Sequence, residues 1–225
     1  MIDTFFSSDG TTWSRLYTQG IYTKRTQIGD AERKTSSVDI PFADGEIETY
    51  SAITPYPVYK RRKLTITLKF NPKTARTDYH SISKQYHGKL MYVGFGDSAN
   101  DAPDYPIYRG YVEVGTGQSK ENGWESKIEV DAEPYARYQP TEQAIAVGES
   151  TLAYENVSYG DLLSFKTETD GTVTFTQDRN GRTYTTTIAG AGTYVLPNIF
   201  LVNGDNTIDV NAEVAATAIY TRRTI

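Results

Sequence analysis

The sequence predicts a mainly β protein of two domains with a single α-helix. The clearest strand covers residues 64–70, where apolar residues alternate with Thr and Lys. A period of two is typical of a strand with one face on a core. Beyond residue 140, turn dipeptides recur about every eight to twelve residues, the spacing of a β-sandwich. The charge balance changes at Tyr138-Gln139-Pro140, so we place the boundary there, with domains 1–140 and 141–225.

In the N-terminal domain we expect strands joined by polar or glycine-containing turns. The strands are expected at residues 2–6, 11–17, 21–28, 64–70, 90–93, 107–114 and 124–130. A hairpin is expected at 38–50, because Asp44-Gly45 between two alternating stretches is a strong short-range hairpin signal.

The one convincing helix follows the strand at 64–70. Asn71-Pro72 ends that strand, because Pro cannot donate to the ladder. Thr77 is expected to cap a helix over about residues 77–87, with Asp78 in its positive first turn. Gly88 suits the left-handed residue that closes a helix. One face of the helix carries the apolar residues Tyr79, Ile82 and Tyr86.

The C-terminal domain contains only short predicted strands. They are expected at residues 173–176, 184–188, 199–202, 207–210 and 215–220. The turn dipeptides Asp170-Gly171, Asn180-Gly181 and Asn203-Gly204 punctuate them. Residues 141–225 carry 5 basic and 10 acidic side chains, against 18 and 18 in residues 1–140. This acidic excess disfavours non-specific nucleic-acid binding by the C-terminal domain.

Composition excludes several classes of protein. Cysteine is absent, so neither disulfides nor a thiolate metal site can hold the fold together. Met1-Ile2-Asp3 is not a basic region followed by a long apolar run, so we expect no secretory signal. No stretch approaches the roughly 18 consecutive apolar residues of a membrane helix, so we expect no membrane partner.

Two groups of residues have the chemistry to bind a metal, and we expect neither to do so. His80 and His87 are about 10 Å of helical rise apart, too far for one zinc whose ligands approach to about 2.1 Å. Asp97, Asp101 and Asp104 share a loop without the EF-hand spacing. We favour a solvated acidic loop and helix-face histidines, with His87 well placed near the negative helix C-terminus.

No catalytic site and no cofactor are predicted. The sequence has no G-x-S-x-G, Walker or H-E-x-x-H motif, and nothing local nominates a carboxylate pair for glycoside hydrolysis. A β-sandwich hydrolase is therefore the weakest of the functions left open. Asn156-Val157-Ser158 matches a glycosylation acceptor, which we treat as accidental without a secretory signal.

Lys60-Arg61-Arg62-Lys63 is the single charge run of the sequence. Glu46, Glu48 or a neighbouring subunit could neutralise it, and we favour an ion-pair role within or between subunits over nucleic-acid binding. Tyr is abundant, 18 against 8 Phe, and Tyr is common at interfaces. We therefore predict three oligomer-interface residues: Tyr59, Arg61 and Arg62.

Six segments in order carry a resemblance to a known family. They read "VDIPFADGEIETY" (38–50), "YKRRKLTITLKF" (59–70), "YHGKLMYVGF" (86–95), "YRGYVEV" (108–114), "IEVDAEPYA" (128–136) and "GDNTIDVNAEVAATAIYTRR" (204–223). Together they resemble the distal tail protein (Dit-like) family of long, non-contractile-tailed phages over nearly the whole chain. The hairpin departs from the commoner Pro-Gly-x-x-Gly motif of that family, because residues 41–45 read Pro-Phe-Ala-Asp-Gly.

The resemblance implies an N-terminal split β-barrel with one helix. It also implies that six copies form a ring, which can pair with a second ring. It also implies a C-terminal galectin-like β-sandwich. Such a ring, assembled in the host cytoplasm and located in the virion tail, links the tail tube protein to tail-tip, tail-associated and receptor-binding proteins. DNA passes through it as cargo. The alternative is a carbohydrate-binding module for a host-surface saccharide, although residues 141–225 offer neither Trp nor His as a stacking platform.

Overall fold

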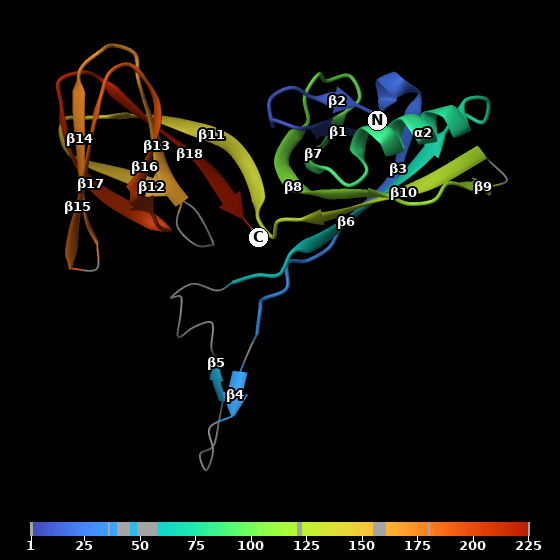
Figure 1. The fold of residues 1–225 in the computed structure, drawn as a ribbon, viewed down its shortest axis with the longest axis horizontal. Helices are drawn as coiled ribbons and strands as arrows, with labels where there is room; N and C mark the ends of the chain where they lie inside the picture. Colours follow the sequence, from blue (N-terminus) through green and yellow to red (C-terminus); the bar gives the residue numbers. More distant parts are fainter. Residues whose placement is uncertain are drawn as a thin grey trace. The chain divides into compact units, whose positions relative to one another are not determined.

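The protein divides into two compact units, Met1–Arg137 and Tyr138–Thr224, shown in Figure 1. The computed structural model describes residues 2–35, 37–39, 46–48, 58–120, 123–154, 161–179 and 181–224. Both units are built mainly of β-strands. The roles that the sequence assigns to domains 1–140 and 141–225 stay predictions.

The N-terminal unit contains strands β1 to β10, a short 3₁₀ helix and one α-helix. They are β1 (Ile2–Ser7), β2 (Ser14–Arg15), η1 (Tyr17–Gln19), β3 (Ile21–Ile28), β4 (Ser37–Asp39), β5 (Glu46–Glu48), β6 (Arg62–Phe70), α2 (Ala75–Tyr86), β7 (Leu90–Asp97), β8 (Asp104–Val114), β9 (Gln118–Lys120) and β10 (Gly123–Ala132). β4 and β5 pair with each other, and the turn expected between them lies outside the described residues.

The main sheet of this unit is antiparallel and has its two ends close together. Its strands are hydrogen-bonded in the order β2-β1-β7-β8-β10-β6-β3. The short strand β2 pairs with Phe5 and Phe6 of β1. The hydroxyl of Thr4, also in β1, is hydrogen-bonded to that of Thr23 in β3 at 2.8 Å, so β1 and β3 meet. Within the described strands this contact is made by side chains and not by a backbone ladder. The sheet is therefore a barrel split between β1 and β3, as expected.

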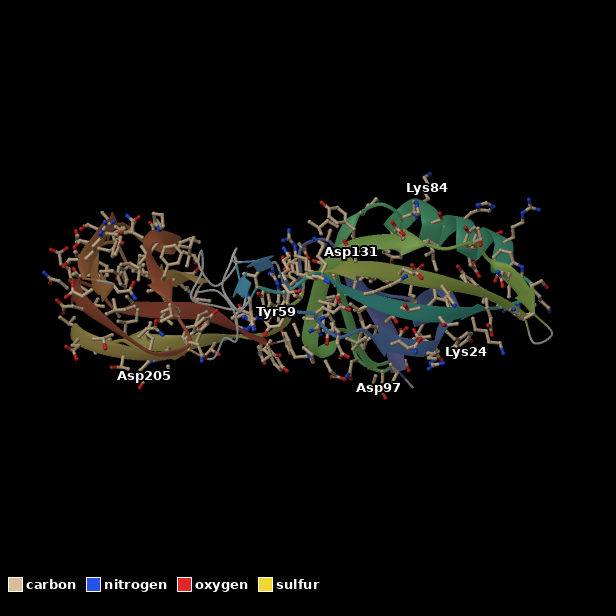
Figure 2. The ribbon with its side chains drawn as sticks, turned by 90° about the horizontal axis from the view of Figure 1, so that it is seen from below. Lys24, Tyr59, Lys84, Asp97, Asp131 and Asp205 are labelled. Carbon is tan, nitrogen blue, oxygen red and sulfur yellow. The ribbon has the colours of Figure 1, made fainter. Side chains whose placement is uncertain are left out.

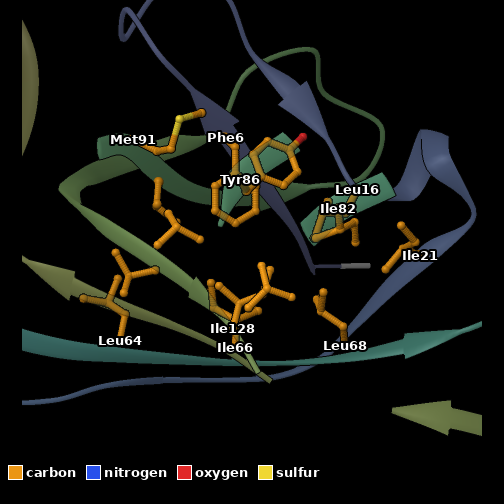
Figure 3. Packing of buried hydrophobic residues seen from close by; sticks show 14 of the residues in the cluster. Phe6, Leu16, Ile21, Leu64, Ile66, Leu68, Ile82, Tyr86, Met91 and Ile128 are labelled. Atoms are coloured by element: carbon orange, nitrogen blue, oxygen red, sulfur yellow. The ribbon is translucent and has the colours of Figure 1, made fainter. Parts of the chain in front are cut away.

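The core of the barrel is organised by β6. Its alternate residues Leu64, Ile66, Leu68 and Phe70 are at most 1% exposed, because this face packs against the hydrophobic core. The strand is paired on both edges, with β10 and β3. Helix α2 covers this core with Ile82 and Tyr86, and the Tyr86 ring stacks on Phe6 with centroids 4.5 Å apart. Figure 3 shows these residues facing the strands. Full burial of one such side chain stabilises the fold by about 1.5–3 kcal/mol.

Two predictions for the N-terminal unit are wrong: the helix N-cap and the strand at 11–17. Thr74, not Thr77, is the helix N-cap; it ends a turn in which its N–H binds Asn71 O at 3.1 Å, and its Oγ1 donates to Asp78. The strand expected at 11–17 is reduced to Ser14–Arg15, followed by η1. The reason is the Asp9 carboxylate, which accepts the backbone N–H groups of residues 11 and 12 and turns the chain.

The C-terminal unit is a sandwich of two antiparallel sheets. Its strands are β11 (Ala136–Ile145, which begins in the first unit), β12 (Gly148–Tyr154), β13 (Asp161–Thr167), β14 (Thr172–Arg179), β15 (Arg182–Ala189), β16 (Gly192–Leu201), β17 (Gly204–Ala212) and β18 (Ala216–Thr224). The sheet orders are β16-β13-β18-β11 and β12-β17-β14-β15. Both sheets contribute to one core, and Phe165 contacts Phe175 across it at 4.5 Å. Gln177 on β14 also exchanges hydrogen bonds with the backbone of Phe200 on β16.

Candidate interface at the start of the central strand

The basic run lies where the pairing of β3 with β6 continues past the barrel. Residues 29–34 run antiparallel to residues 58–63, with backbone hydrogen bonds of 2.7–2.8 Å and a bridge between Arg33 and Tyr59. This two-stranded ribbon leads on towards β4 and β5. Tyr59 and Asp131 are labelled in Figure 2, where both lie at the end of the barrel that the ribbon leaves.

Three of the four basic residues form ion pairs within the chain. Lys60 Nζ lies 2.9 Å from Glu32, Arg61 Nε 2.7 Å from Asp131, and Lys63 Nζ 2.6 Å from Glu129. All these side chains are exposed, so each pair contributes about 0–1 kcal/mol. The side chains of Glu46 and Glu48, the partners proposed from the sequence, lie outside the part that the structure describes.

Arg62 is different because strand alternation points it inward. The residue is 6% exposed, and its guanidinium lies 5.6 Å from the centre of the Tyr108 ring. Its buried Nε has no hydrogen-bond partner among the described residues. Arg61 instead lies over the exposed Tyr111 ring at 5.5 Å, and the Tyr59 ring meets Tyr135 edge-on at 6.2 Å. The interface role of Tyr59, Arg61 and Arg62 stays a prediction. Of the two arginines, Arg61 is the one whose charge is accessible to a neighbouring subunit.

A second charged cluster, which sequence reasoning missed, lies near the beginning of β11. Glu133 binds Arg109 Nη1 at 3.0 Å and Arg137 Nη2 at 2.8 Å, and both guanidinium groups lie 5.6 Å from the Tyr92 ring centre. Burial alone would raise the pKa of Glu133, but hydrogen bonds and charge from the two arginines outweigh it and hold the pKa below its usual value. No local signal joins Arg109 to Glu133, because β-sheet pairing brings them together.

The two histidines make separate contacts. His87 Nδ1 accepts the N–H of Val114 at 3.0 Å, which an imidazolium could not do. His87 is the C-cap residue of α2, so it lies at the helix C-terminus as expected. His80 is exposed and lies beside the Tyr79 ring. Among the described residues, no group of three or more His, Cys, Asp or Glu side chains is arranged to hold a metal ion.

The acidic loop is held by an arginine. Arg15 Nη1 donates to the carbonyl oxygens of Ser98 at 3.0 Å and Asn100 at 2.8 Å, and it lies 3.8 Å from the Asp101 carboxylate. A calcium ion would need such oxygens as ligands, and here a guanidinium already uses them. The Asn156 acceptor motif lies outside the described residues, and no described helix is long and apolar enough to cross a membrane.

Comparison with known proteins identifies the fold. No protein-family model matches the chain, and no curated protein sequence matches it. Among solved structures, the Dit protein of SPP1 is similar over 100% of both chains, with a TM-score of 0.63 and 9% identity. The two chains share a fold. Two structures of the phage P2 baseplate in its activated conformation, with Ca and with Sr, cover 100% of this chain and 99% of theirs, with TM-scores of 0.47 and 0.46 and identities of 9% and 8%.

Proposed function

We propose that this chain is a distal tail protein: a structural, non-catalytic hub that forms a hexameric ring at the end of a phage tail tube. The observation that carries the proposal is the end-to-end fold match to SPP1 Dit, a protein described as a paradigm of the hub adsorption apparatus in phages that infect Gram-positive hosts. The six sequence segments that resemble this family support the same assignment.

The open side of the split barrel supports assembly into a ring. Among the described strands, β3 forms a backbone ladder only with β6; its other edge contacts β1 through the Thr4–Thr23 hydroxyl pair and has no backbone ladder. Beside this free edge, Ile2 is 64% and Ile28 45% exposed, and they line a hollow of about 360 Å³ together with Phe95 and residues 23–26. An unpaired strand edge next to exposed apolar side chains is a template for another chain. We assign this edge to the subunit contact, with Tyr59, Arg61 and Arg62 along the same strand pair.

The role places the protein in the virion tail. The ring would link the tail tube protein to tail-tip, tail-associated and receptor-binding proteins, and DNA would pass through its centre. Each of these partners is a proposal that follows from the hub role.

The mass of the purified full-length protein tests the proposal. Six copies of the 25.1 kDa chain have a mass of about 151 kDa, measurable by native mass spectrometry, and negative-stain images should show six-fold rings. Ile28→Asp should give folded monomers, because a charge at the free edge opposes pairing. Val147→Asp, at a 66% exposed position in the other unit, is the control and should leave the ring intact.

A wild-type protein that is monomeric at all micromolar concentrations and shows no rings would overturn the proposal. If that monomer bound host-surface saccharides, the carbohydrate-binding module left open by the sequence would be the better assignment.

A further inference from the structure

The outer face of the barrel sheet is divided into a basic and a mixed half. The strand register places Lys69 opposite Glu125 and Thr67 opposite Lys127, while Lys63 lies opposite Asp131 further along. Among the described residues, the basic half contains Lys24, Arg25, Lys69, Lys120 and Lys127, with Glu125 as its carboxylate and Glu129 at its border with the mixed half. The mixed half contains Glu113, Glu129 and Asp131 against Arg61 and Lys63. Lys24 and Asp131, labelled in Figure 2, lie towards opposite ends of this face.

Most cations of the basic half form no ion pair with a carboxylate in the part of the chain that the structure describes. Lys24 Nζ binds Glu125 at 2.5 Å. Its hydrogen bond is the main reason that the pKa of Glu125 is lowered, and the charges of Lys120 and Lys69 lower that pKa further. Lys69, Lys120 and Lys127 form no ion pair with any described carboxylate, so their charges remain available to a ligand.

A hollow of about 540 Å³ opens within this half. It lies where residues 115–117 connect β8 to β9 along β10. Gly115 N–H donates to Lys127 O and Ser126 Oγ donates to Gly115 O, both at 2.8 Å, so this connection is held on β10. Lys120 and Lys127 line it, with Gln118 and Thr67 as neutral donors. The carboxylates that line it, Glu125 and Glu129, are already bound to Lys24 and Lys63.

We propose that this hollow binds the phosphate groups of a phosphodiester polymer, with Lys120 and Lys127 as contacts and Lys69 flanking them. Lysine ammonium groups bind phosphate as point charges. A polymer with one charge per repeat reaches several lysines at once, which a single small anion cannot do. DNA and a phosphate-containing surface polymer share this chemistry, and the experiment separates them. The inference rests on the sheet face and does not require the hub role.

The test measures binding of the full-length protein to a labelled DNA duplex, to labelled poly(glycerol phosphate) and to polyglutamate as a carboxylate comparison. With three lysine–phosphate contacts, duplex affinity should fall about 40-fold between roughly 50 and 200 mM salt. K120Q/K127Q should bind about tenfold or more weakly and lose about two units of the salt slope. The matched control, K84Q/K89Q, removes two exposed charges at α2 and the loop after it, and should bind like the wild type. Thermal unfolding checks that both variants are folded.

Binding of the duplex alone assigns the hollow to DNA, and binding of poly(glycerol phosphate) alone assigns it to a surface polymer; either supports the proposal if K120Q/K127Q weakens it about tenfold or more. Three results would overturn the proposal: no phosphodiester binding at low salt, equal loss in the control variant, or equally tight binding of polyglutamate.

Discussion

Reversing the charge of Arg61 and of Arg62 separately should distinguish an accessible interface residue from a core residue. The Arg61 side chain is 41% exposed and pairs with an exposed Asp131. An exposed pair contributes about 0–1 kcal/mol, so Arg61→Glu should lower the free energy of unfolding by about 1 kcal/mol. Arg62 is 6% exposed over Tyr108. A carboxylate at that position would be a buried, unpaired charge, and we expect a loss of about 3–5 kcal/mol.

Chemical unfolding followed by tryptophan fluorescence measures both losses. Trp13 and Trp124 are the protein's two tryptophans, and both lie in the N-terminal unit, so the signal reports on that unit alone. Native mass spectrometry of the same variants reports on the ring. Arg61→Glu should keep a folded unit and weaken the ring, since a loss of about 0–1 kcal/mol is repeated at six contacts. Arg62→Glu should destabilise the unit itself in any oligomeric state.

Two outcomes would refute this reasoning. Equal destabilisation by the two substitutions would show that the inward and outward assignment of Arg61 and Arg62 is wrong. An unchanged ring with Arg61→Glu would show that the basic run is a solvated face. Arg76→Glu, on the exposed side of α2, is the control and should change neither measurement.

Three further predictions follow from single contacts and from the division into units. Glu133→Gln should lower the free energy of unfolding by about 1–3 kcal/mol at pH 7. Because the folded pKa of Glu133 lies below the usual pKa of a Glu side chain, its contribution is present above that usual pKa and is lost as pH falls through the folded pKa, so denaturation curves of wild type and variant should converge in acid. His87→Ala should cost about 0.5–1.5 kcal/mol in the same assay, because Val114 N–H loses its acceptor; no loss would show that water replaces the ring. Fragments 1–140 and 141–225 should each unfold cooperatively, since each unit has its own hydrophobic cluster, and 1–140 should form the ring. A folded but strictly monomeric 1–140 would contradict that division of roles.

Local patterns predicted the central strand and the helix better than their ends, and they missed β9, β11, β12 and β13. The alternation in residues 64–70 identified the central strand and its buried face, because burial of alternate residues is a property of the strand itself. The stripe of Ile82 and Tyr86 identified the helix for the same reason. The cap was misplaced because Thr74 and Thr77 are equivalent by residue type, and only the turn closed by Asn71 O selects Thr74. The strand expected at 11–17 was displaced by side-chain hydrogen bonds from Asp9, which periodicity does not show.

The charged sites depend on strand pairing, and this limits what a linear charge pattern can indicate. Extending the alternation of residues 64–70 backwards would have placed Arg62 inward and Arg61 and Lys63 outward. Their partners Asp131 and Glu129 are set by the register of β10 against β6, which no local pattern contains. The conspicuous run at 60–63 is therefore largely neutralised by its own chain. Lys69, Lys120 and Lys127 form no run in the sequence, yet sheet pairing gathers them on one face without carboxylate partners among the described residues. An unneutralised charge costs nothing in folding while it stays in water and remains free to bind an anion, so the scattered lysines are the better candidates for a ligand.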